Sequence, residues 1–215
     1  MHILSSKLVF PPVDDALEDG LLAIGGDLST ERLKLAYQEG IFPWYEGNTP
    51  LWWSPDPRFV LFPEKLYVSK SMKQVIKKEE FSFSINTCFS EVIHYCKVNN
   101  RPGQSGTWIT DEVEAAYCKL HKEGLAISAE ARKNGVLVGG LYGIRMGKLF
   151  FGESMFSHVS NASKFAFIQL VNQLIRENVV LIDCQVYTEH LASLGAEMIS
   201  RKEFKRYLQN YLQPG

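Results

Sequence analysis

The chain has 215 residues, of which 46% are hydrophobic and 22% charged, and its formal net charge is −1. This composition is typical of a globular protein and excludes disordered, collagen-like and coiled-coil chains. A net charge so close to zero gives no field over the whole molecule that would attract nucleic acid or a membrane, so any such binding needs a local patch. At roughly 150 residues per domain, the length predicts one large domain, or a core domain with a small appendage.

The cysteines and the N-terminus indicate the cellular compartment. Four cysteines, at positions 88, 96, 118 and 184, form neither the close pairs of a zinc site nor the framework of a small secreted scaffold, so reduced thiols are expected. No apolar run approaches about 18 residues, and the first residues turn acidic after Pro11-Pro12. We therefore expect a cytoplasmic protein without membrane contact and, by default, a monomer.

Charge is unevenly distributed along the chain. Residues 1–31 contain six acids and one lysine, whereas residues 65–78 contain five lysines and no acid. Ser69 can cap a helix over Lys70 to Lys78, which would present its lysines on the outer face. This segment is the local basic patch of the sequence.

The N-terminal part is predicted to contain one helix and a rigid loop. Capping residues on both sides predict the helix over Thr30 to Glu39. The stretch from Ile41 to Pro63 is rich in Pro and Trp, and closely spaced prolines exclude an interior helix because each removes a donor and fixes φ. We interpret it as a rigid loop that ends a small N-terminal domain, residues 1–62, and precedes a larger domain, residues 63–215.

The larger segment is predicted to mix helices and strands. Turn signals at Asn134-Gly135 and Met146-Gly147 favour an antiparallel meander of three strands. Around this meander lie β-α-β pieces, so we predict an α+β (mixed α/β) fold, a mixed sheet with helices packed on both faces. In chain order the expected elements are a helix over 70–78, a strand over 81–85, helices over 89–97 and 110–124, strands over 125–131, 136–144 and 148–155, a helix over 162–177, a strand over 179–183 and a helix around 204–211.

Common enzyme signatures are absent. The sequence has no G-x-x-x-x-G-K-[ST] loop and no G-x-G-x-x-G that opens a helix, so nucleotide phosphates have no evident cradle. Gly152-Glu-Ser154 begins like a nucleophile elbow, but Phe156 stands in place of the final glycine. The five histidines are dispersed, so neither zinc chemistry nor covalent nucleophilic catalysis is indicated, and we expect no metal and no cofactor.

Nine unusual local sequences follow one another from the N-terminus to the last helix. They are Gly20-Leu-Leu-Ala-Ile-Gly-Gly-Asp-Leu28, Gly40-Ile-Phe-Pro-Trp44, Leu51-Trp-Trp-Ser-Pro-Asp-Pro-Arg58, Thr107-Trp-Ile-Thr110, Val138-Gly-Gly-Leu-Tyr-Gly143, Phe150-Phe-Gly-Glu-Ser-Met-Phe156, Ala162-Ser-Lys164, Leu181-Ile-Asp-Cys-Gln185 and Leu191-x-Ser-Leu-Gly-Ala196. In this order and at these spacings they resemble the bacterial leucyl/phenylalanyl-tRNA–protein transferases, from about Phe10 to Leu212.

This resemblance implies both a fold and a reaction. The fold would be a small N-terminal domain followed by an acetyltransferase-like (acyl-CoA N-acyltransferase-like) domain. The reaction would transfer Leu or Phe, and less readily Met, from aminoacyl-tRNA to the α-amino group of proteins that begin with Arg or Lys, which marks them for N-degron proteolysis. Because an aminoacyl ester is already activated, this transfer needs no ATP, metal or protein nucleophile, in agreement with the missing signatures.

The resemblance also implies catalytic residues. Asp183 and Gln185 match the acid and the amide that are proposed to act in the transfer, and Glu153 matches an acid near the substrate ester. Since a neutral amide is a poor base, we expect Gln185 to orient the attacking amine as a hydrogen-bond acceptor, polarised by Asp183. Without the resemblance, Asp183 and Gln185 could equally cap a turn after a strand, and Glu153 could be a solvated glutamate.

The binding residues implied by the resemblance fall into three groups. The apolar pocket for the transferred side chain would consist of Leu141, Phe150, Phe167, Leu170 and Ile182, with Tyr117 nearby. Trp44 and Trp108 match aromatic positions that line the site and could stack the terminal adenosine. The acceptor stem of the tRNA would contact Lys70, Lys73, Lys77 and Lys78, through phosphate contacts that carry no sequence information. From the sequence alone, the apolar residues could be ordinary core and the lysines a solvated face.

Two other classes of protein remain as alternatives. An acetyl-CoA-dependent N-acetyltransferase would share the fold but should carry a [QR]-x-x-G-x-[GA] loop between a strand and a helix, and none is suitably placed. A non-catalytic tRNA-binding module would explain the lysines and tryptophans, but not the combination of Glu153, Asp183 and Gln185. A binding assay separates them, because such a module would bind deacylated and aminoacylated tRNA similarly and transfer nothing.

Overall fold

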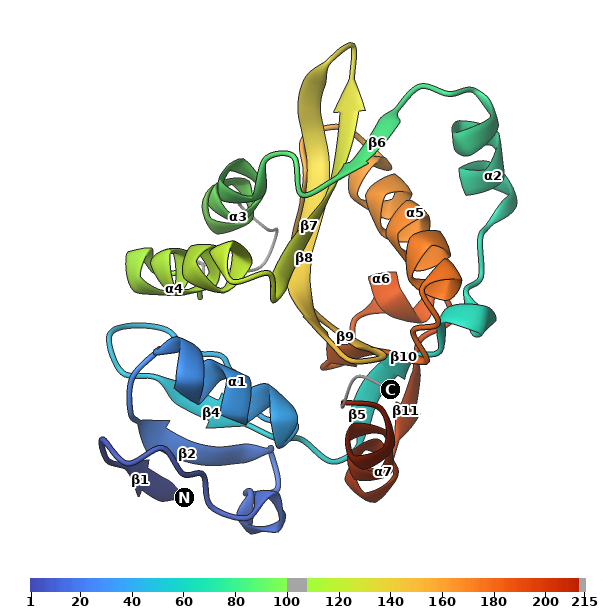
Figure 1. Cartoon of the computed structure of the whole chain (residues 1–215). Coiled ribbons are helices and arrows are strands. Elements are labelled where there is room, and N and C mark those ends of the chain that lie inside the picture. The colour runs from blue at the N-terminus through green and yellow to red at the C-terminus, as the bar shows by residue number, and fades with distance from the viewer. Residues whose placement is uncertain (100–107, 213–215) are drawn as a thin grey trace.

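The computed structural model describes residues 1–99 and 108–212 of the chain, which contain two sheets (Figure 1). The smaller sheet has four strands in the order β1 (His2–Leu4), β2 (Leu21–Gly25), β4 (Leu51–Trp53) and β3 (Phe42–Pro43). The larger sheet has seven strands in the order β11 (Glu197–Ile199), β5 (Arg58–Leu61), β10 (Leu181–Gln185), β9 (Leu149–Ser157), β8 (Val136–Met146), β7 (Ala126–Lys133) and β6 (Ser82–Ile85).

The larger sheet is mixed, as predicted from the element order. Strand β6 pairs antiparallel with β7, β7 with β8 and β8 with β9, which confirms the meander. At its first turn Asn134 and Gly135 both have positive φ, 52° and 80°, the backbone that a tight hairpin needs and that Asn-Gly readily adopts. Strand β10 pairs parallel with β9 and antiparallel with β5, so this pair is where the sheet changes from a meander to crossover connections.

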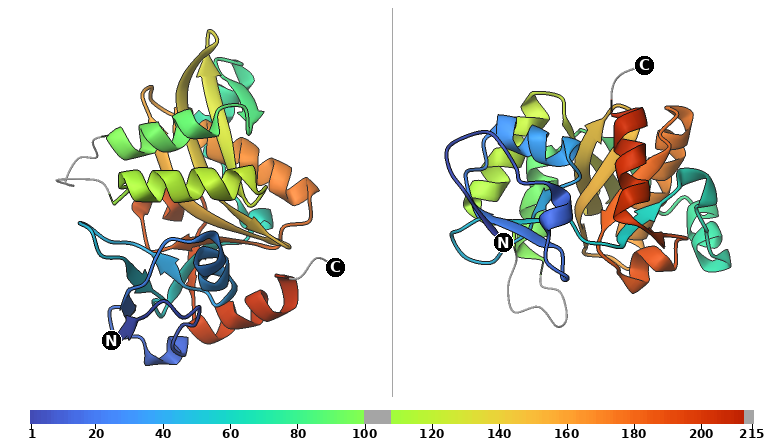
Figure 2. Two further views of the ribbon diagram at one scale, coloured as in Figure 1. Left: turned by 60° about the vertical axis from the view of Figure 1, so that its left-hand side comes forward. Right: turned by 90° about the horizontal axis from the view of Figure 1, so that it is seen from below.

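Helices cover both faces of the larger sheet, which confirms the predicted mixed α/β architecture (Figure 1). One face carries α3 (Phe89–Val98) and α4 (Asp111–Lys122), which lie side by side (Figure 2, left), and the other carries α5 (Ala162–Arg176). The remaining helices are α1 (Thr30–Gln38), α2 (Lys70–Lys77), α6 (Glu189–Ala192) and α7 (Arg201–Tyr211), with short 3₁₀ turns η1 (Val13–Asp15) and η2 (Pro63–Lys65).

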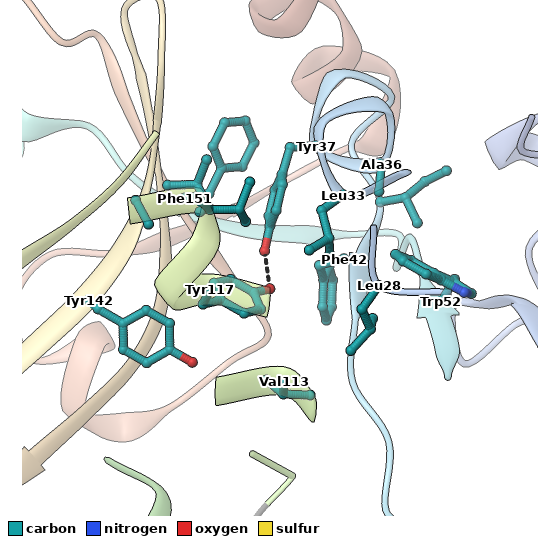
Figure 3. Packing of buried hydrophobic residues seen from close by; sticks show 14 of the residues in the cluster. Leu28, Leu33, Ala36, Tyr37, Phe42, Trp52, Val113, Tyr117, Tyr142 and Phe151 are labelled. Carbon is teal, nitrogen blue, oxygen red and sulfur yellow. Dashed lines mark hydrogen bonds between the residues drawn. The ribbon is translucent and has the colours of Figure 1, made fainter. Parts of the chain in front are cut away.

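The two faces of the larger sheet carry two hydrophobic clusters. One cluster joins α3, α4 and α7 to α1 and the smaller sheet, and it contains the fully buried Trp52, Tyr37 and Tyr117 (Figure 3). The other packs α5 against the opposite face, with α2 at its edge through Met72. The N-terminal segment and the larger sheet therefore share one core, although their strands form separate sheets.

The prediction of a rigid loop over residues 41–63 is wrong, because β3, β4 and β5 all lie in this segment. Its prolines are compatible with strands. Pro43 lies in β3, at the edge of the smaller sheet, where a residue can lack an N–H without costing the sheet a hydrogen bond. Pro55 and Pro57 lie between β4 and β5. Trp52 of β4 is buried and donates its indole N–H to the Gly25 carbonyl over 2.8 Å.

The division into residues 1–62 and 63–215 stays a prediction. Strand β5 precedes this boundary in the sequence, but it is hydrogen-bonded into the larger sheet between β10 and β11. The chain therefore passes from the smaller to the larger sheet between β4 and β5.

Two further features bear on the expectations from composition. All four cysteines are free thiols. Among residues 1–99 and 108–212, no helix combines the length and the apolarity that a membrane crossing requires.

The glycine pair at the centre of β8 allows α5 to approach the sheet closely. A Cβ atom on Gly139 would lie 2.6 Å from the Cβ of Ala162 and 2.8 Å from its carbonyl carbon, at the first residue of α5. The register between β7 and β8 also shifts beside Gly139. A close backbone approach and a register shift therefore both occur at Gly139.

We expect Gly139→Ala to lower the free energy of unfolding by about 1–3 kcal/mol, because the added methyl group overlaps the backbone of α5. Gly152→Ala is the matched control, since its Cβ would meet no atom closer than 3.5 Å, and it should cost less than about 1 kcal/mol. Urea denaturation of the three proteins measures both effects. Equal midpoints for the two variants would contradict the proposed close contact.

Candidate functional site

The candidate site lies where the parallel strands β9 and β10 separate. Their pairing runs through Leu181 with Leu149 and Ile182 with Phe150, and ends at Asp183 with Phe151. Both strands continue beyond this point, so Gly152 and Glu153 on β9 face Cys184 and Gln185 on β10 across an opening rather than a ladder. Ends of parallel strands are common ligand sites because the diverging backbones leave a crevice.

A cavity of about 510 Å³ occupies this opening. Its size is within the range of small-molecule sites, and much of its wall is apolar or aromatic. The lining residues come from β3 and the loop after it, the segment before α4, strands β8 to β10, α5, and the segment from β10 into α6: Phe42, Trp44, Trp108, Leu141, Tyr142, Gly152, Glu153, Ser154, Met155, Phe167, Ile182, Asp183, Cys184, Gln185, Val186, Tyr187, Thr188, His190 and Leu191.

Asp183 forms a buried ion pair with Arg58 of β5. The Arg58 Nε donates to Oδ1 of Asp183 over 2.8 Å, and Nη2 donates to Oδ2 over 2.7 Å, with both side chains only 1% exposed. The guanidinium group lies between the rings of Phe42 and Phe204, whose centroids are 4.7 and 4.8 Å from its Cζ. This two-pronged geometry is the strong form of a carboxylate contact, and it neutralises the charge of Asp183.

Gln185 is held by both acids of the site. Its backbone N–H donates to Oδ1 of Asp183 over 2.9 Å, and its φ of 65° lies in the left-handed region that residues other than glycine rarely adopt. Its side-chain Nε2 donates to Oε1 of Glu153 over 2.8 Å. Asp183 therefore acts on the backbone of Gln185, whereas the sequence led us to expect that it polarises the amide side chain.

Glu153 is the centre of a polar cluster inside the apolar wall. The Tyr37 hydroxyl of α1 lies 2.7 Å from its Oε1, and the Tyr117 hydroxyl of α4 lies 3.1 Å from its Oε2, both within hydrogen-bond distance. The two tyrosine hydroxyls are also hydrogen-bonded to each other (Figure 3). The pKa of Glu153 is raised to about 8, chiefly by loss of solvation and in smaller part by the nearby Asp183, against the opposing effect of the tyrosine hydrogen bonds.

The structure brings most of the sequence-predicted site residues together around the cavity. Those that line it are Trp44, Trp108, Leu141, Glu153, Phe167, Ile182, Asp183 and Gln185. Trp44 is 40% exposed and Trp108 half-buried, so both retain accessible ring surface. Thr107, which precedes Trp108 in its motif, lies outside the described residues.

Three residues predicted for the substrate pocket do not line the cavity. Phe150 and Leu170 are buried in the cluster beneath it, and the Phe150 ring packs where a Cβ on Gly143 would lie. Tyr117 lies behind Glu153 and supports it through its hydroxyl. Burial in the core, which the sequence left as an alternative reading, describes the first two.

The predicted basic residues Lys70, Lys73, Lys77 and Lys78 are all exposed on or just after α2. Within residues 1–99 and 108–212, Lys70, Lys73 and Lys77 have no acidic partner in salt-bridge range, and Lys78 lies 3.9 Å from Glu80 at a largely exposed position. Helix α2 packs against α5, the helix that supplies Phe167 to the cavity. The basic face and the cavity are thus connected through one helix.

Several residues of the site escaped the sequence analysis. Arg58 ends a motif and Tyr37 lies in the first predicted helix, but neither was assigned a role in the site. A buried tyrosine hydroxyl needs a partner, which was the available signal for Tyr37. His190 also lines the cavity; burial and Lys164 lower its pKa, and its Nε2 is buried without a hydrogen-bond partner.

In the part of the chain that the structure describes, no three or more His, Cys, Asp or Glu side chains are grouped so that they could bind a metal ion. The cavity instead offers a fixed amide, a carboxyl group of raised pKa and apolar walls. Such a site can bind an apolar group and orient polar reactants beside it.

Two family models match the chain. Residues 60–209 match the leucyl/phenylalanyl-tRNA protein transferase model, and residues 26–56 match the model of the N-terminal domain of the same proteins. Together they include every residue of the cavity wall described above.

Individual relatives agree with the family models over almost the whole chain. A leucyl/phenylalanyl-tRNA–protein transferase of Flavobacterium johnsoniae is 56% identical over 98% of this chain and 100% of its own length. One of Pseudomonas putida is 55% identical over 96% of this chain and 92% of its own. Among solved structures, L-PGS from Bacillus licheniformis has a TM-score of 0.43 at 13% identity, covering 80% of this chain and 57% of its own. A GCN5-related N-acetyltransferase from Kribbella flavida has a TM-score of 0.40 at 9% identity, covering 76% and 58%.

We expect Arg58→Leu to lower the free energy of unfolding by about 3–5 kcal/mol, because it leaves the Asp183 carboxylate buried without its counter-ion. The matched control is Lys65→Leu, which removes the exposed ion pair between Lys65 and Glu197 and should change stability little. Thermal or urea unfolding measures both. A loss in Arg58→Leu no larger than in the control would contradict the role assigned to the buried pair.

Proposed function

Since the chain belongs to the leucyl/phenylalanyl-tRNA protein transferase family, it is an aminoacyltransferase, and we propose that it transfers Leu or Phe, and less readily Met, to proteins that begin with Arg or Lys. The donor is aminoacyl-tRNA, and the acceptor is the α-amino group of the protein. The new N-terminal residue marks the acceptor for N-degron proteolysis. The enzyme works in the cytoplasm as a monomer without a cofactor.

The observation that carries this proposal is the fixed orientation of the Gln185 amide. Its Nε2 is engaged by Glu153, so its Oε1 is left as an acceptor in the wall of the cavity. An α-amine has a pKa of about 7.7–8.0, so a large fraction is already neutral near pH 7.5 and needs only orientation. In our proposal Oε1 of Gln185 accepts a hydrogen bond from that amine and directs its lone pair at the ester.

The apolar walls select the transferred side chain. Leu141, Phe167 and Ile182 form an apolar surface next to Gln185 and Glu153. A buried apolar pocket discriminates by shape and by the cost of burying charge, which favours Leu and Phe over small or charged residues. Trp44 and Trp108 border the same cavity, where each can stack the terminal adenosine and hold the ester above the pocket.

Positioning supplies most of the catalysis in this scheme. The amine nitrogen attacks the ester carbonyl carbon, and the bond to the ribose oxygen breaks, with no covalent bond to the protein. Holding two reactants in a near-attack arrangement can lower the barrier by about 7–11 kcal/mol. The ion pair between Arg58 and Asp183 contributes by fixing the backbone of Gln185.

The exposed lysines of α2 are proposed to hold the acceptor stem. Three of them, Lys70, Lys73 and Lys77, lie within eight residues of one helix, with Lys78 directly after it. Phosphate contacts of this kind position RNA without reading its sequence. They therefore suit an enzyme that accepts tRNAs carrying different amino acids.

The test is incubation of the purified protein with radiolabelled leucyl-tRNA and a model protein that begins with Arg, without ATP. A matched protein that begins with Glu serves as the control acceptor. We expect label in the Arg protein only. Label in neither protein, despite tRNA binding, would contradict the proposed transfer and favour a tRNA-binding module.

The same assay tests the role of Gln185. Gln185→Met keeps the length of the side chain but removes the acceptor oxygen, and we expect kcat to fall about 100-fold, comparable with the loss of one oriented polar group at a reacting centre. Gln209→Met, on the exposed side of α7, is the control. Equal rates for the two variants would remove Gln185 from the proposed mechanism.

We expect Lys70→Ala/Lys73→Ala to weaken tRNA binding and to reduce the slope of log Kd against log salt by about 1.5, since each phosphate contact contributes about 0.7–0.9. The control is Lys119→Ala/Lys122→Ala on α4, which lies on the opposite face of the larger sheet. Filter binding over a range of salt concentrations measures both slopes. A slope in the α2 variant equal to that of the wild type would refute the proposed contact.

A further inference from the structure

Three oxygen-bearing groups from three different elements form a closed ring beside Gln185. Tyr37 comes from α1, Tyr117 from α4 and Glu153 from β9. Each tyrosine hydroxyl is hydrogen-bonded to the other and to a different oxygen of the carboxyl group, Tyr37 to Oε1 at 2.7 Å and Tyr117 to Oε2 at 3.1 Å. Figure 3 shows the two hydroxyls pointing toward each other between α1 and α4.

The number of protons in this ring decides the state of Glu153. Three oxygen-to-oxygen contacts need three hydrogens, but the two tyrosine hydroxyls supply only two. If Glu153 were ionised, one contact would bring two lone pairs together beside two fully buried tyrosines. A proton on Oε2 of Glu153 completes the ring: Oε2 donates to Tyr117, Tyr117 donates to Tyr37, and Tyr37 donates to Oε1, which also accepts from Gln185.

We propose that Glu153 is protonated in the resting site and serves as the acid that protonates the leaving ribose oxygen, while Tyr37 and Tyr117 position it. This inference rests on the proposed function. Glu153 is the member of the ring that lines the cavity, next to the amide that orients the attacking amine. Tyr37 and Tyr117 touch the carboxyl group from behind and hold its two oxygens in fixed directions.

The proton transfers balance over one reaction. The amine nitrogen bonds to the ester carbonyl carbon, and the bond from that carbon to the ribose oxygen breaks. Glu153 turns its proton from Tyr117 to the ribose oxygen as that oxygen leaves, and the proton that the amine nitrogen loses returns to Glu153. The ring is therefore neutral before and after the transfer, and it presents no negative charge to the oxyanion that forms at the ester.

Other titratable groups around the ring are less suited to this role. Both oxygens of Asp183 are engaged by Arg58, and one also accepts from the backbone of Gln185. Burial lowers the pKa of His190, so its ring is neutral near pH 7, and burial raises the pKa of the Cys184 thiol, which makes it a weak acid. Tyr142 packs against the Tyr117 ring, and Tyr187 is 56% exposed at the cavity.

The protonation of Glu153 determines how the activity changes with pH. The active form of Glu153 is protonated, and its pKa is raised to about 8, so activity falls as the pH rises through that value. The acceptor amine must be neutral, so activity rises with pH up to about 7.7–8.0. The wild-type profile of kcat/KM is therefore bell-shaped, with Glu153 responsible for the alkaline limb.

Infrared difference spectroscopy tests the protonation without any substrate. The wild-type spectrum minus that of Glu153→Gln should contain the carbonyl band of a protonated carboxylic acid at pH 7, and this band should disappear as the pH is raised above 8. Glu64→Gln, at an exposed position, is the control, and its difference spectrum should lack this pH-dependent band. A carboxylate signal from Glu153 at pH 7 would overturn the inference.

Activity measurements test the acid role. Glu153→Gln cannot give up a proton, so kcat should fall by about 100-fold or more. Tyr37→Phe opens the ring and removes a hydrogen bond to the carboxyl group, so the alkaline limb should shift, whereas the exposed control Tyr67→Phe should leave it in place. A limb that does not move in Tyr37→Phe would overturn the assignment to Glu153. Absence of transfer by the wild type would instead overturn the proposed function.

Discussion

The buried ion pair between Arg58 and Asp183 is the interaction on which the site depends. Removing two charges from water costs several kcal/mol per ion, and only paired hydrogen bonds and close packing offset that cost. Here two hydrogen bonds, of 2.7 and 2.8 Å, and the rings of Phe42 and Phe204 on either side of the guanidinium provide them. Because the same carboxylate also accepts the backbone N–H of Gln185, the ion pair fixes the left-handed turn that places the amide. Stability and site geometry therefore depend on the same atoms.

The N-terminal segment completes the site rather than merely accompanying it. Tyr37 of α1 supports Glu153, and Phe42 and Trp44 form part of the cavity wall. The core that joins α1 and the smaller sheet to α4 holds these side chains in place. With Asp183 neutralised by Arg58 and Glu153 protonated, the cavity presents no net negative charge to an ester that develops an oxyanion, although two acids line it.

Much of the fold is determined by local signals in the sequence. The helices α1, α2, α3, α4, α5 and α7 lie within a few residues of their predicted bounds, because apolar periodicity and capping side chains such as Ser29 and Thr110 act over neighbouring residues. The meander was predictable from turns such as Asn134-Gly135. The prolines of residues 41–63 were misleading, because proline excludes a helix interior but permits edge strands and connections, and only pairing with other strands decides between them.

The sequence by itself determined the family, through nine ordered motifs, and with it the residue types that line the site. Tertiary structure decided which of them meet: Glu153 with Tyr37 and Tyr117, Asp183 with Arg58, and Gln185 with both acids. Arg58 and Asp183 are 125 residues apart in the chain. Contacts over such separations cannot be predicted from the periodicity of the sequence, because periodicity indicates only which side of a helix or strand is buried. The protonation of Glu153 has the same origin, since it follows from the number of hydrogens that three distant side chains bring to one point.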